Sequence, residues 1–331
     1  MNMKTIMAVA LMSLGGIGTT SAQEVTELKF SVGPPPQVHF NKHLFIPWAE
    51  KVSADSKGTL KVKMFFAGTL GKEGQFVDLV ESGAVDIAFD IPAYYPGRFK
   101  RTDVAGLPML ITDAVDGSKA LWEMYKEGVF GDDFDGLKVL AISTPPAALL
   151  ITTKTPVTAP ADMKGLKIAG GGKIKGATIE TLGAAPVDTK VAELYQSMGR
   201  GVVDGALTYY TAVPPFKLHE VGKHYTEVPL GGSFLLVFMS QEKFDSLPEA
   251  AQKAIDMNSG LAMSEAFGEV WENAQKVGRK MVEESGGEIR RFDDAALTAW
   301  SNQLKPVAQS WVADVDGRQA VVDSLSAKLG K

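Results

Sequence analysis

Short apolar runs alternate with amphipathic stretches over the first third of the chain, and this alternation predicts an α/β fold. Residues 27–33, 59–68 and 84–92 are short runs rich in apolar side chains, which is typical of strands. Residues 39–58 and 72–83 carry apolar side chains at helical spacing, and each stretch ends at a glycine that can stop a helix. The order strand, helix, strand, helix, strand is the pattern of a parallel or mixed sheet covered by helices.

The alternation begins again further along the chain. The predicted elements are, in order, strands at 136–143, 148–157 and 162–170, a helix at 173–183, a short strand at 185–189, a helix at 190–201, a strand at 202–210 and a long apolar strand at 233–240. We expect the strand at 148–157 to leave one sheet for another. The tail from Pro248 to Lys331 has helical spacing throughout, and its tryptophans are predicted packing anchors.

Two segments share one plan, which predicts two similar lobes. "FVDLVESGAVDIAFD" and "LYQSMGRGVVDGALT" each read as a helix, a stopping glycine and a strand opened by Val-Asp. We expect Gly83 and Gly201 to take the positive φ that ends a helix. We expect Asp86 and Asp204 to bond neighbouring backbone at the strand entry. Lobes built alike predict a ligand site between them, at the carboxyl ends of the strands.

The first residues resemble an export signal. "MNMKTIMAVALMSLGGIGTTSAQE" has a lysine near its start, a short apolar centre and small residues before Gln23. We therefore predict a signal peptide at 1–22, cleaved near Ala22–Gln23, and a mature chain in the periplasm. The chain has no cysteine, so a disulfide, a thiolate nucleophile and a zinc–sulfur site are excluded. Its formal charge of −5 argues against a general nucleic-acid binder.

The glycine-rich stretch "GLKIAGGGKIKG" looks like a phosphate loop, but its spacing does not match one. Gly171 and Gly176 have the separation of the P-loop glycines, yet an alanine follows Gly176 where the motif requires lysine. The dinucleotide fingerprint fails as well, because Lys175 occupies its last glycine position. A flexible loop before a helix N-terminus remains, and its free N–H groups favour an anion. A solvated turn is the alternative interpretation.

Other catalytic or metal-binding patterns are weak. His39 and His43 lie four residues apart, which places both on one face of a helix, but no acidic ligand follows in the manner of H-E-x-x-H. No G-x-S-x-G motif occurs, and no pattern of residues points to a Ser/His/Asp triad. We predict no cofactor, no metal and no catalytic residue.

Two tyrosine doublets follow the echoed strands. Tyr94-Tyr95 comes after the first Val-Asp strand, and Tyr209-Tyr210 comes after the second. If the lobes face each other, these side chains face one cleft. Tyrosine offers an apolar face and one hydroxyl, which suits a small polar organic ligand. Packing at the hinge or within the lobes is the alternative.

With these residues in view, the chain resembles the periplasmic solute-binding proteins of tripartite ATP-independent periplasmic (TRAP) transporters. The segments that carry the resemblance are "AGTLGKEGQFVDLVESGAVDIAF", "LPML", "PADMKGLKI", "TLGAAPV", "VAELYQSMGRGVVDG" and "FDSLPEAAQKAI". Each segment is moderately specific, and their order and spacing together cover nearly the whole mature chain.

The resemblance implies a receptor with no chemistry of its own. It implies two α/β lobes, each a mixed sheet flanked by helices, joined by crossing strands and braced by a long helix. On this plan, lobe I comprises 23–148 and 232–265, and lobe II comprises 149–231 and 266–331. The lobes close on a small organic acid and deliver it to a membrane permease of two subunits. A monomer is expected.

The usual ligand-clamping residues of the resembled family are missing. Most members carry an arginine after the strand of "KGLKI", and it forks onto the ligand's carboxylate; the matching residue here is Ala169. A usual asparagine is matched by Thr208. Three explanations stay open: Lys173 or Lys175 supplies the charge, the free N–H groups of residues 170–172 bind the anion, or the ligand is neutral or cationic.

The candidate site combines these loops. Its predicted solute-binding residues are Pro36, Gln37, His39, Ile91, Tyr94, Tyr95, Ala169, Gly170, Gly171, Lys173, Thr208, Tyr209, Tyr210 and Phe234. Two other classes of function stay open at this point. One is an exported hydrolase with a triad scattered across the cleft, and the other is a sensor protein that hands its ligand to a membrane receptor.

Overall fold

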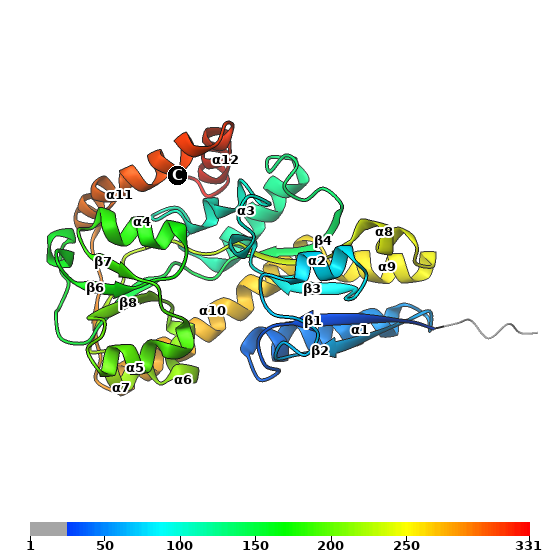
Figure 1. Ribbon diagram of the computed structural model, residues 1–331, viewed down its shortest axis with the longest axis horizontal. Coiled ribbons are helices and arrows are strands. Elements are labelled where there is room, and N and C mark those ends of the chain that lie inside the picture. The colour runs from blue at the N-terminus through cyan, green and yellow to red at the C-terminus, as the bar shows by residue number, and fades with distance from the viewer. Residues whose placement is uncertain (1–24) are drawn as a thin grey trace, which may run out of the picture.

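Two separate sheets organise the chain, which a computed structural model describes over residues 25–331 (Figure 1). The first sheet has the strand order β2-β1-β3-β10-β4. Its strands are β1 (Thr26–Val32), β2 (Leu60–Phe65), β3 (Ile87–Asp90), β4 (Leu137–Ser143) and β10 (Leu235–Ser240). β1 pairs in parallel with β2 and β3, whereas β10 runs antiparallel to both β3 and β4. We call the half built on this sheet lobe I.

The second sheet has the order β11-β9-β5-β8-β6-β7 and defines lobe II. Its strands are β5 (Leu149–Thr152), β6 (Lys167–Ala169), β7 (Ala185–Val187), β8 (Gly205–Thr208), β9 (His224–Thr226) and β11 (Glu288–Arg290). β6 pairs in parallel with β7 and β8, while β5 is antiparallel to β8 and β9. The predicted two-lobed α/β fold with mixed sheets is therefore confirmed.

Helices cover both sheets. In lobe I they are a π-helical turn η1 (Asn41–Phe45), α1 (Ile46–Asp55), α2 (Phe76–Glu81), the 3₁₀ turns η2 (Pro92–Tyr94) and η3 (Thr102–Gly106), α3 (Ala114–Lys126), α8 (Gln241–Asp245) and α9 (Glu249–Asn258). In lobe II they are η4 (Pro160–Met163), α4 (Lys173–Thr181), η5 (Val191–Glu193), α5 (Leu194–Gly199), η6 (Tyr210–Ala212), α6 (Val213–Phe216) and α7 (Leu218–Val221). None of the helices in residues 25–331 combines the length and apolar character needed to cross a membrane.

The internal echo is a true structural repeat. Gly83 and Gly201 both adopt positive φ, of 73° and 71°. The carboxylate of Asp86 accepts a hydrogen bond from the backbone N–H of Lys29 at 2.8 Å, and Asp204 accepts one from Lys167 at the same distance. Each aspartate thus fastens the start of its strand to the neighbouring parallel strand, which fixes the register of β3 on β1 and of β8 on β6.

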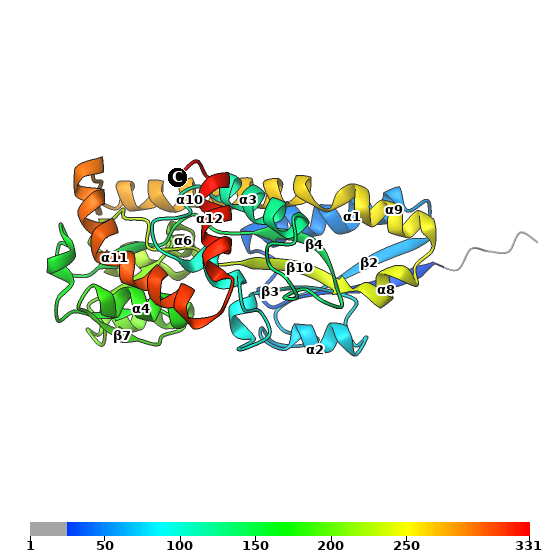
Figure 2. The ribbon, with the colours of Figure 1, turned by 90° about the horizontal axis from the view of Figure 1, so that it is seen from above.

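One long helix, α10 (Leu261–Glu284), connects the lobes (Figure 2). Its first part packs into the lobe I core through the fully buried Phe267, and its last part packs into the lobe II core through Val282. Gly278 lies against lobe II so closely that a Cβ there would be 1.9 Å from the carbonyl oxygen of Tyr210. The side chains between these two anchors, around Trp271, lie where the helix passes from one lobe to the other.

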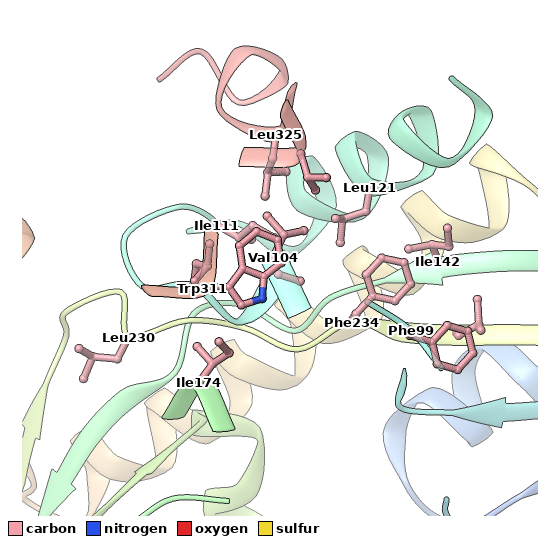
Figure 3. Packing of buried hydrophobic residues seen from close by; sticks show 14 of the residues in the cluster. Phe99, Val104, Ile111, Leu121, Ile142, Ile174, Leu230, Phe234, Trp311 and Leu325 are labelled. Carbon is pink, nitrogen blue, oxygen red and sulfur yellow. The ribbon is translucent and has the colours of Figure 1, made fainter. Parts of the chain in front are cut away.

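The C-terminal helices form a second connection, which we call the strap. α11 (Asp294–Asp314) packs along α4 of lobe II, and α12 (Arg318–Lys328) packs on α3 of lobe I. Figure 3 shows the cluster beneath the corner between them, with Trp311 of α11 next to Val104 of lobe I and near Ile174 of lobe II. One apolar core therefore continues across both lobes.

Some expectations need correction. The tail is not helical throughout, because β11 interrupts it and pairs in parallel with β9 at the edge of the second sheet. The helix expected over 39–58 contains the π-helical turn before Pro47 and ends at Asp55. Trp300 and Trp311 are buried anchors as expected. The predicted signal peptide lies outside the described residues.

Candidate functional site

The carboxyl ends of the parallel strands bring the candidate residues together. In lobe I, β1 leads into Gly33 and β3 ends at Asp90, followed by Tyr94. In lobe II, β6 ends at Ala169 and β8 ends at Thr208. Because loops at the carboxyl ends of such strands are free to carry functional groups, ligands of α/β folds bind there. We call the region between these strand ends the interlobe site.

Tyr94 is the exposed aromatic side chain of the lobe I wall. It is 49% exposed, which is unusual for so large a ring. Burial of its hydroxyl, together with the charges of Glu73 and Asp90 and the nearby Tyr209, raises the pKa of Tyr94 to about 12. The phenol is therefore neutral at physiological pH and can donate a hydrogen bond.

Tyr209 and Lys175 form the lobe II wall. The ammonium of Lys175 lies 4.6 Å from the centre of the Tyr209 ring, which is a cation–π contact. The Tyr209 hydroxyl is 3.2 Å from the hydroxyl of Ser233, in the segment that returns the chain to lobe I. Lys175 belongs to the first turn of α4, whose N-cap Gly172 makes no side-chain cap hydrogen bond. This wall therefore presents a cation, an aromatic face and the first N–H groups of α4. The N–H of Gly170, one of the residues predicted to bind an anion, instead donates to the carbonyl oxygen of Val187 at 3.1 Å.

The second tyrosine of each doublet donates a hydrogen bond to a carboxylate of its own lobe. Tyr95 donates a short hydrogen bond to Asp90, and its oxygen accepts one from the N–H of Val77. Tyr210 is buried and donates to Glu227 at 2.9 Å. Burial and these carboxylates raise the pKa of both phenols. The structure thus ties Tyr95 and Tyr210 into their own lobes by hydrogen bonds, whereas no carboxylate within residues 25–331 accepts a hydrogen bond from Tyr94 or Tyr209.

The two lysines that follow the glycine loop have different partners. Lys173 pairs with Asp314 at the end of α11, at 2.5 Å, and is directed to the strap. Lys175 stays beside the site residues, with its Cβ 3.6 Å from the position that a Cβ on Gly170 would occupy. Gly171 lies near the carboxylate of Asp188. Ala169 is only 1% exposed and packs in the lobe II core, so its methyl group leaves the wall without charge.

The first loop contributes mainly His39. Pro36 and Gln37 are exposed at the turn, whereas the His39 ring packs edge-on to Trp271 of α10 at 4.5 Å between centres. Burial, helped by the charge of His43, lowers the pKa of His39 to about 4, so the ring is neutral at pH 7. Among residues 25–331, its buried Nε2 finds no hydrogen-bond partner, and neither do Trp271 Nε1 and Gln275 Oε1. Trp271 and Gln275 are one turn apart on α10, so these polar atoms belong to the stretch of helix between the lobes.

The remaining predicted residues lie deeper. Thr208 is 2% exposed, and its hydroxyl has no hydrogen-bond partner in the described structure. Ile91 is half-buried and packs on the lobe I core. Phe234 is buried and packs against Phe130 and Phe134 in the core. These side chains support the strand ends.

Sequence reasoning missed the acidic side of the site. Glu73 lies over Gly33, since a Cβ on that glycine would meet the Glu73 Cγ at 2.6 Å. Asp90 ends β3 and accepts hydrogen bonds from the N–H groups of Gly74 and Ile91. Burial raises the pKa of both carboxyl groups, and the charge of Asp90 adds to the effect on Glu73. A polar residue at the end of a buried apolar strand, as in "IAFDIP", is the signal that could have found Asp90.

Comparison with known proteins places this geometry in a family. Residues 36–314 match the sequence model of the bacterial extracellular solute-binding proteins, family 7. A TRAP solute-binding protein from a marine metagenome, specific for aromatic acid ligands and solved with metahydroxyphenylacetate, is 31% identical with a TM-score of 0.85, over 93% of this chain and 99% of that one.

Two further relatives are similar. A TRAP solute-binding protein of Rhodoferax ferrireducens T118, solved with copurified benzoate, is 29% identical with a TM-score of 0.83, over 92% of this chain and 98% of that one. The 2,3-diketo-L-gulonate-binding periplasmic protein YiaO of Escherichia coli K12 is 29% identical over 76% of this chain and 77% of its own length.

Proposed function

Because the chain belongs to family 7 of the bacterial extracellular solute-binding proteins, and is a receptor of the TRAP type, we propose that it captures a small aromatic carboxylate between its lobes. The observation that carries the proposal is the lobe II wall, where the Lys175 ammonium lies on the Tyr209 ring. A planar acid can stack on such a ring while its carboxylate reaches the cation. The aromatic acids bound by the two structural relatives support this ligand class.

Lys175 is the proposed carboxylate partner, in place of the arginine that Ala169 cannot supply. Lys173 is held by Asp314, whereas Lys175 has no carboxylate partner among the ion pairs of residues 25–331. A lysine is a compact point charge without the forked geometry of arginine, so the acid is held by charge and stacking. The N–H groups at the start of α4 add to this preference for an anion.

Closure of the lobes completes the proposed site. Tyr94 is exposed on one wall, and its hydroxyl is a donor that the approaching ligand or lobe can use. Drawing the walls together removes water and strengthens every polar contact between them. A half-exposed tyrosine on the open wall is what such a motion would bury.

The transport setting follows the family. We propose that the chain carries a signal peptide at 1–22, works in the periplasm as a monomer, and delivers its ligand to the two membrane subunits of a TRAP permease. The free carboxylate of Glu73 favours a second candidate, a cationic solute held at the lobe I wall. A ligand screen that includes both charge types separates the two candidates.

Calorimetry on the mature chain tests the proposal with benzoate, phenylacetate, their hydroxylated forms and matched aromatic amines. We expect the acids to bind and Lys175→Met to weaken them about tenfold or more, because a charged hydrogen bond is lost. Lys173→Met is the matched control and should bind within about twofold of the wild type, because its partner is at the strap. Binding of the amines alone, or equal effects of the two variants, would overturn the proposal.

A further inference from the structure

Glu73 occupies the wall opposite Lys175. Its side chain lies over Gly33 at the end of β1, and the next residue, Gly74, lies against Tyr94, since a Cβ on that glycine would be 3.4 Å from the Tyr94 Cβ. On the lobe II wall, the Lys175 ammonium is stacked on Tyr209. The lobe I wall therefore carries an acid beside Tyr94, and the lobe II wall carries a cation on Tyr209.

The Glu73 carboxylate is a free acceptor. Within residues 25–331, no side-chain hydrogen bond or ion pair engages it, and its side chain is only partly buried, against Gly33. Asp90, the adjacent acid, differs in this respect. It is 1% exposed, and it already accepts hydrogen bonds from two backbone N–H groups and from Tyr95. A ligand can therefore donate a hydrogen bond to Glu73 without breaking the hydrogen bonds that Asp90 already accepts.

A free carboxylate in a closing site needs a donor. When the lobes come together, Glu73 loses water, and leaving an ionised acceptor without a partner costs more than leaving a neutral one. Its charge also repels the carboxylate of an acid ligand, which orients that group to Lys175. The end of the ligand that reaches Glu73 is then the end that carries a hydroxyl or amino group.

We propose that Glu73 is a specificity-determining residue that accepts a hydrogen bond from a hydroxyl or amino group at the end of the ligand remote from its carboxylate. This inference rests on the proposed function and narrows it to acids with a polar donor, such as hydroxylated aromatic acids. A hydrogen bond to an ionised acceptor is stronger than one between neutral groups, so the donor should decide between otherwise equal ligands.

The test compares matched ligand pairs, benzoate with 3-hydroxybenzoate and phenylacetate with 3-hydroxyphenylacetate, by calorimetry on the mature protein. The wild type should bind the hydroxylated member about tenfold more tightly. Glu73→Leu, which removes the acceptor, should bring the affinity ratio within a pair close to one. Glu73→Gln keeps an uncharged acceptor and should retain part of the preference. Asp78→Asn, an exposed acid on α2, is the charge-matched control and should keep the wild-type ratio.

The outcomes are distinguishable. If the wild type binds both members of each pair equally, or if Glu73→Leu strengthens both members and leaves their ratio unchanged, Glu73 acts only by repulsion and the inference is overturned while the proposed function stands. If the wild type binds neither member of either pair, the proposed function falls and the inference falls with it. Because the readout is a ratio within one variant, partial loss of folded protein does not imitate the expected result.

Discussion

In each tyrosine doublet, residues of the same type take different roles because of their neighbours. Tyr95 and Tyr210 each donate a hydrogen bond to a carboxylate of their own lobe, and that hydrogen bond fixes the position of the ring within the lobe. Among residues 25–331, neither Tyr94 nor Tyr209 donates a hydrogen bond to a carboxylate, and the Tyr209 hydroxyl is instead close to that of Ser233. The doublets were correctly expected at equivalent edges, but only the three-dimensional position of Asp90 and Glu227 separates the two roles.

A second residue-scale prediction concerns Glu73, whose ionised carboxylate should lower the free energy of unfolding at neutral pH. Burial and the charge of Asp90 raise the pKa of Glu73 above its usual range. A raised carboxyl pKa means that the folded protein holds the proton more tightly, so stability is lost as pH rises above the unfolded value of about 4.3. We expect Glu73→Gln to be more stable than the wild type at pH 7, with the gain vanishing below about pH 4.

Urea unfolding of both proteins at pH 7 and pH 3.5 measures this difference. A gain that persists unchanged at the lower pH would mean that the carboxylate charge is not its cause. Sites that bind ligands often hold such unfavourable charges, because the ligand supplies the missing partner.

At the scale of elements, strands and helix ends were predictable and contacts between distant elements were not. The stop at Gly83 and the entry at Asp86 follow from local chemistry, and both have the expected geometry. β11 was missed because a strand of three residues forms only where the edge of β9 is open to it. Trp271 was expected as a packing anchor, and it packs against the lobe I core. Its contact with His39 could not be predicted, because His39 lies far from it in the sequence.

The close approach of α10 to lobe II leads to a prediction for this helix. Alanine favours a helix over glycine by about 1 kcal/mol in isolation. At Gly278, however, the new Cβ would overlap the Tyr210 carbonyl oxygen, 1.9 Å away. We expect Gly278→Ala to destabilise the protein by about 1–3 kcal/mol, as overpacking does.

Thermal unfolding of Gly278→Ala beside Val277→Ala checks this expectation. Val277 is 59% exposed on the same helix, so its truncation should change stability little. Equal stability of Gly278→Ala and the wild type would show that α10 can move away from lobe II without cost.

At the scale of the whole molecule, the strap packs on both lobes, and we expect it to make them unfold together. Arg318 is 7% exposed and donates to the carbonyl oxygens of Lys100 in lobe I and Trp311 in α11, at 2.7 and 2.8 Å. Its guanidinium also lies 4.3 Å from the centre of the Trp311 ring. The corner of the strap is thus fastened to lobe I while α11 lies along α4 of lobe II.

Arg318→Ala should therefore cost about 2–4 kcal/mol, because two charged hydrogen bonds and a stacked contact are lost. Calorimetry should also show a broader or divided transition, since the lobes lose one of their links. Arg200→Ala removes an exposed arginine and should alter stability by less than about 0.5 kcal/mol. A single sharp transition at the wild-type temperature for Arg318→Ala would mean that α10 alone couples the lobes.

The position of β10 has a consequence for the order in which the chain can fold. β10 lies between β3 and β4 in the first sheet, yet it follows all but β11 of the second sheet in sequence. While the chain is being synthesised, the backbone edges of β3 and β4 that pair with β10 stay unpaired until β10, which ends at Ser240, has been made. Folding that depends on so distant a pairing is slow. β1, β2 and β3 can pair with one another before then, but β4 has no partner in its sheet except β10. The first sheet therefore becomes continuous only as a late event, after the strands β5 to β9 of the other lobe have already been made.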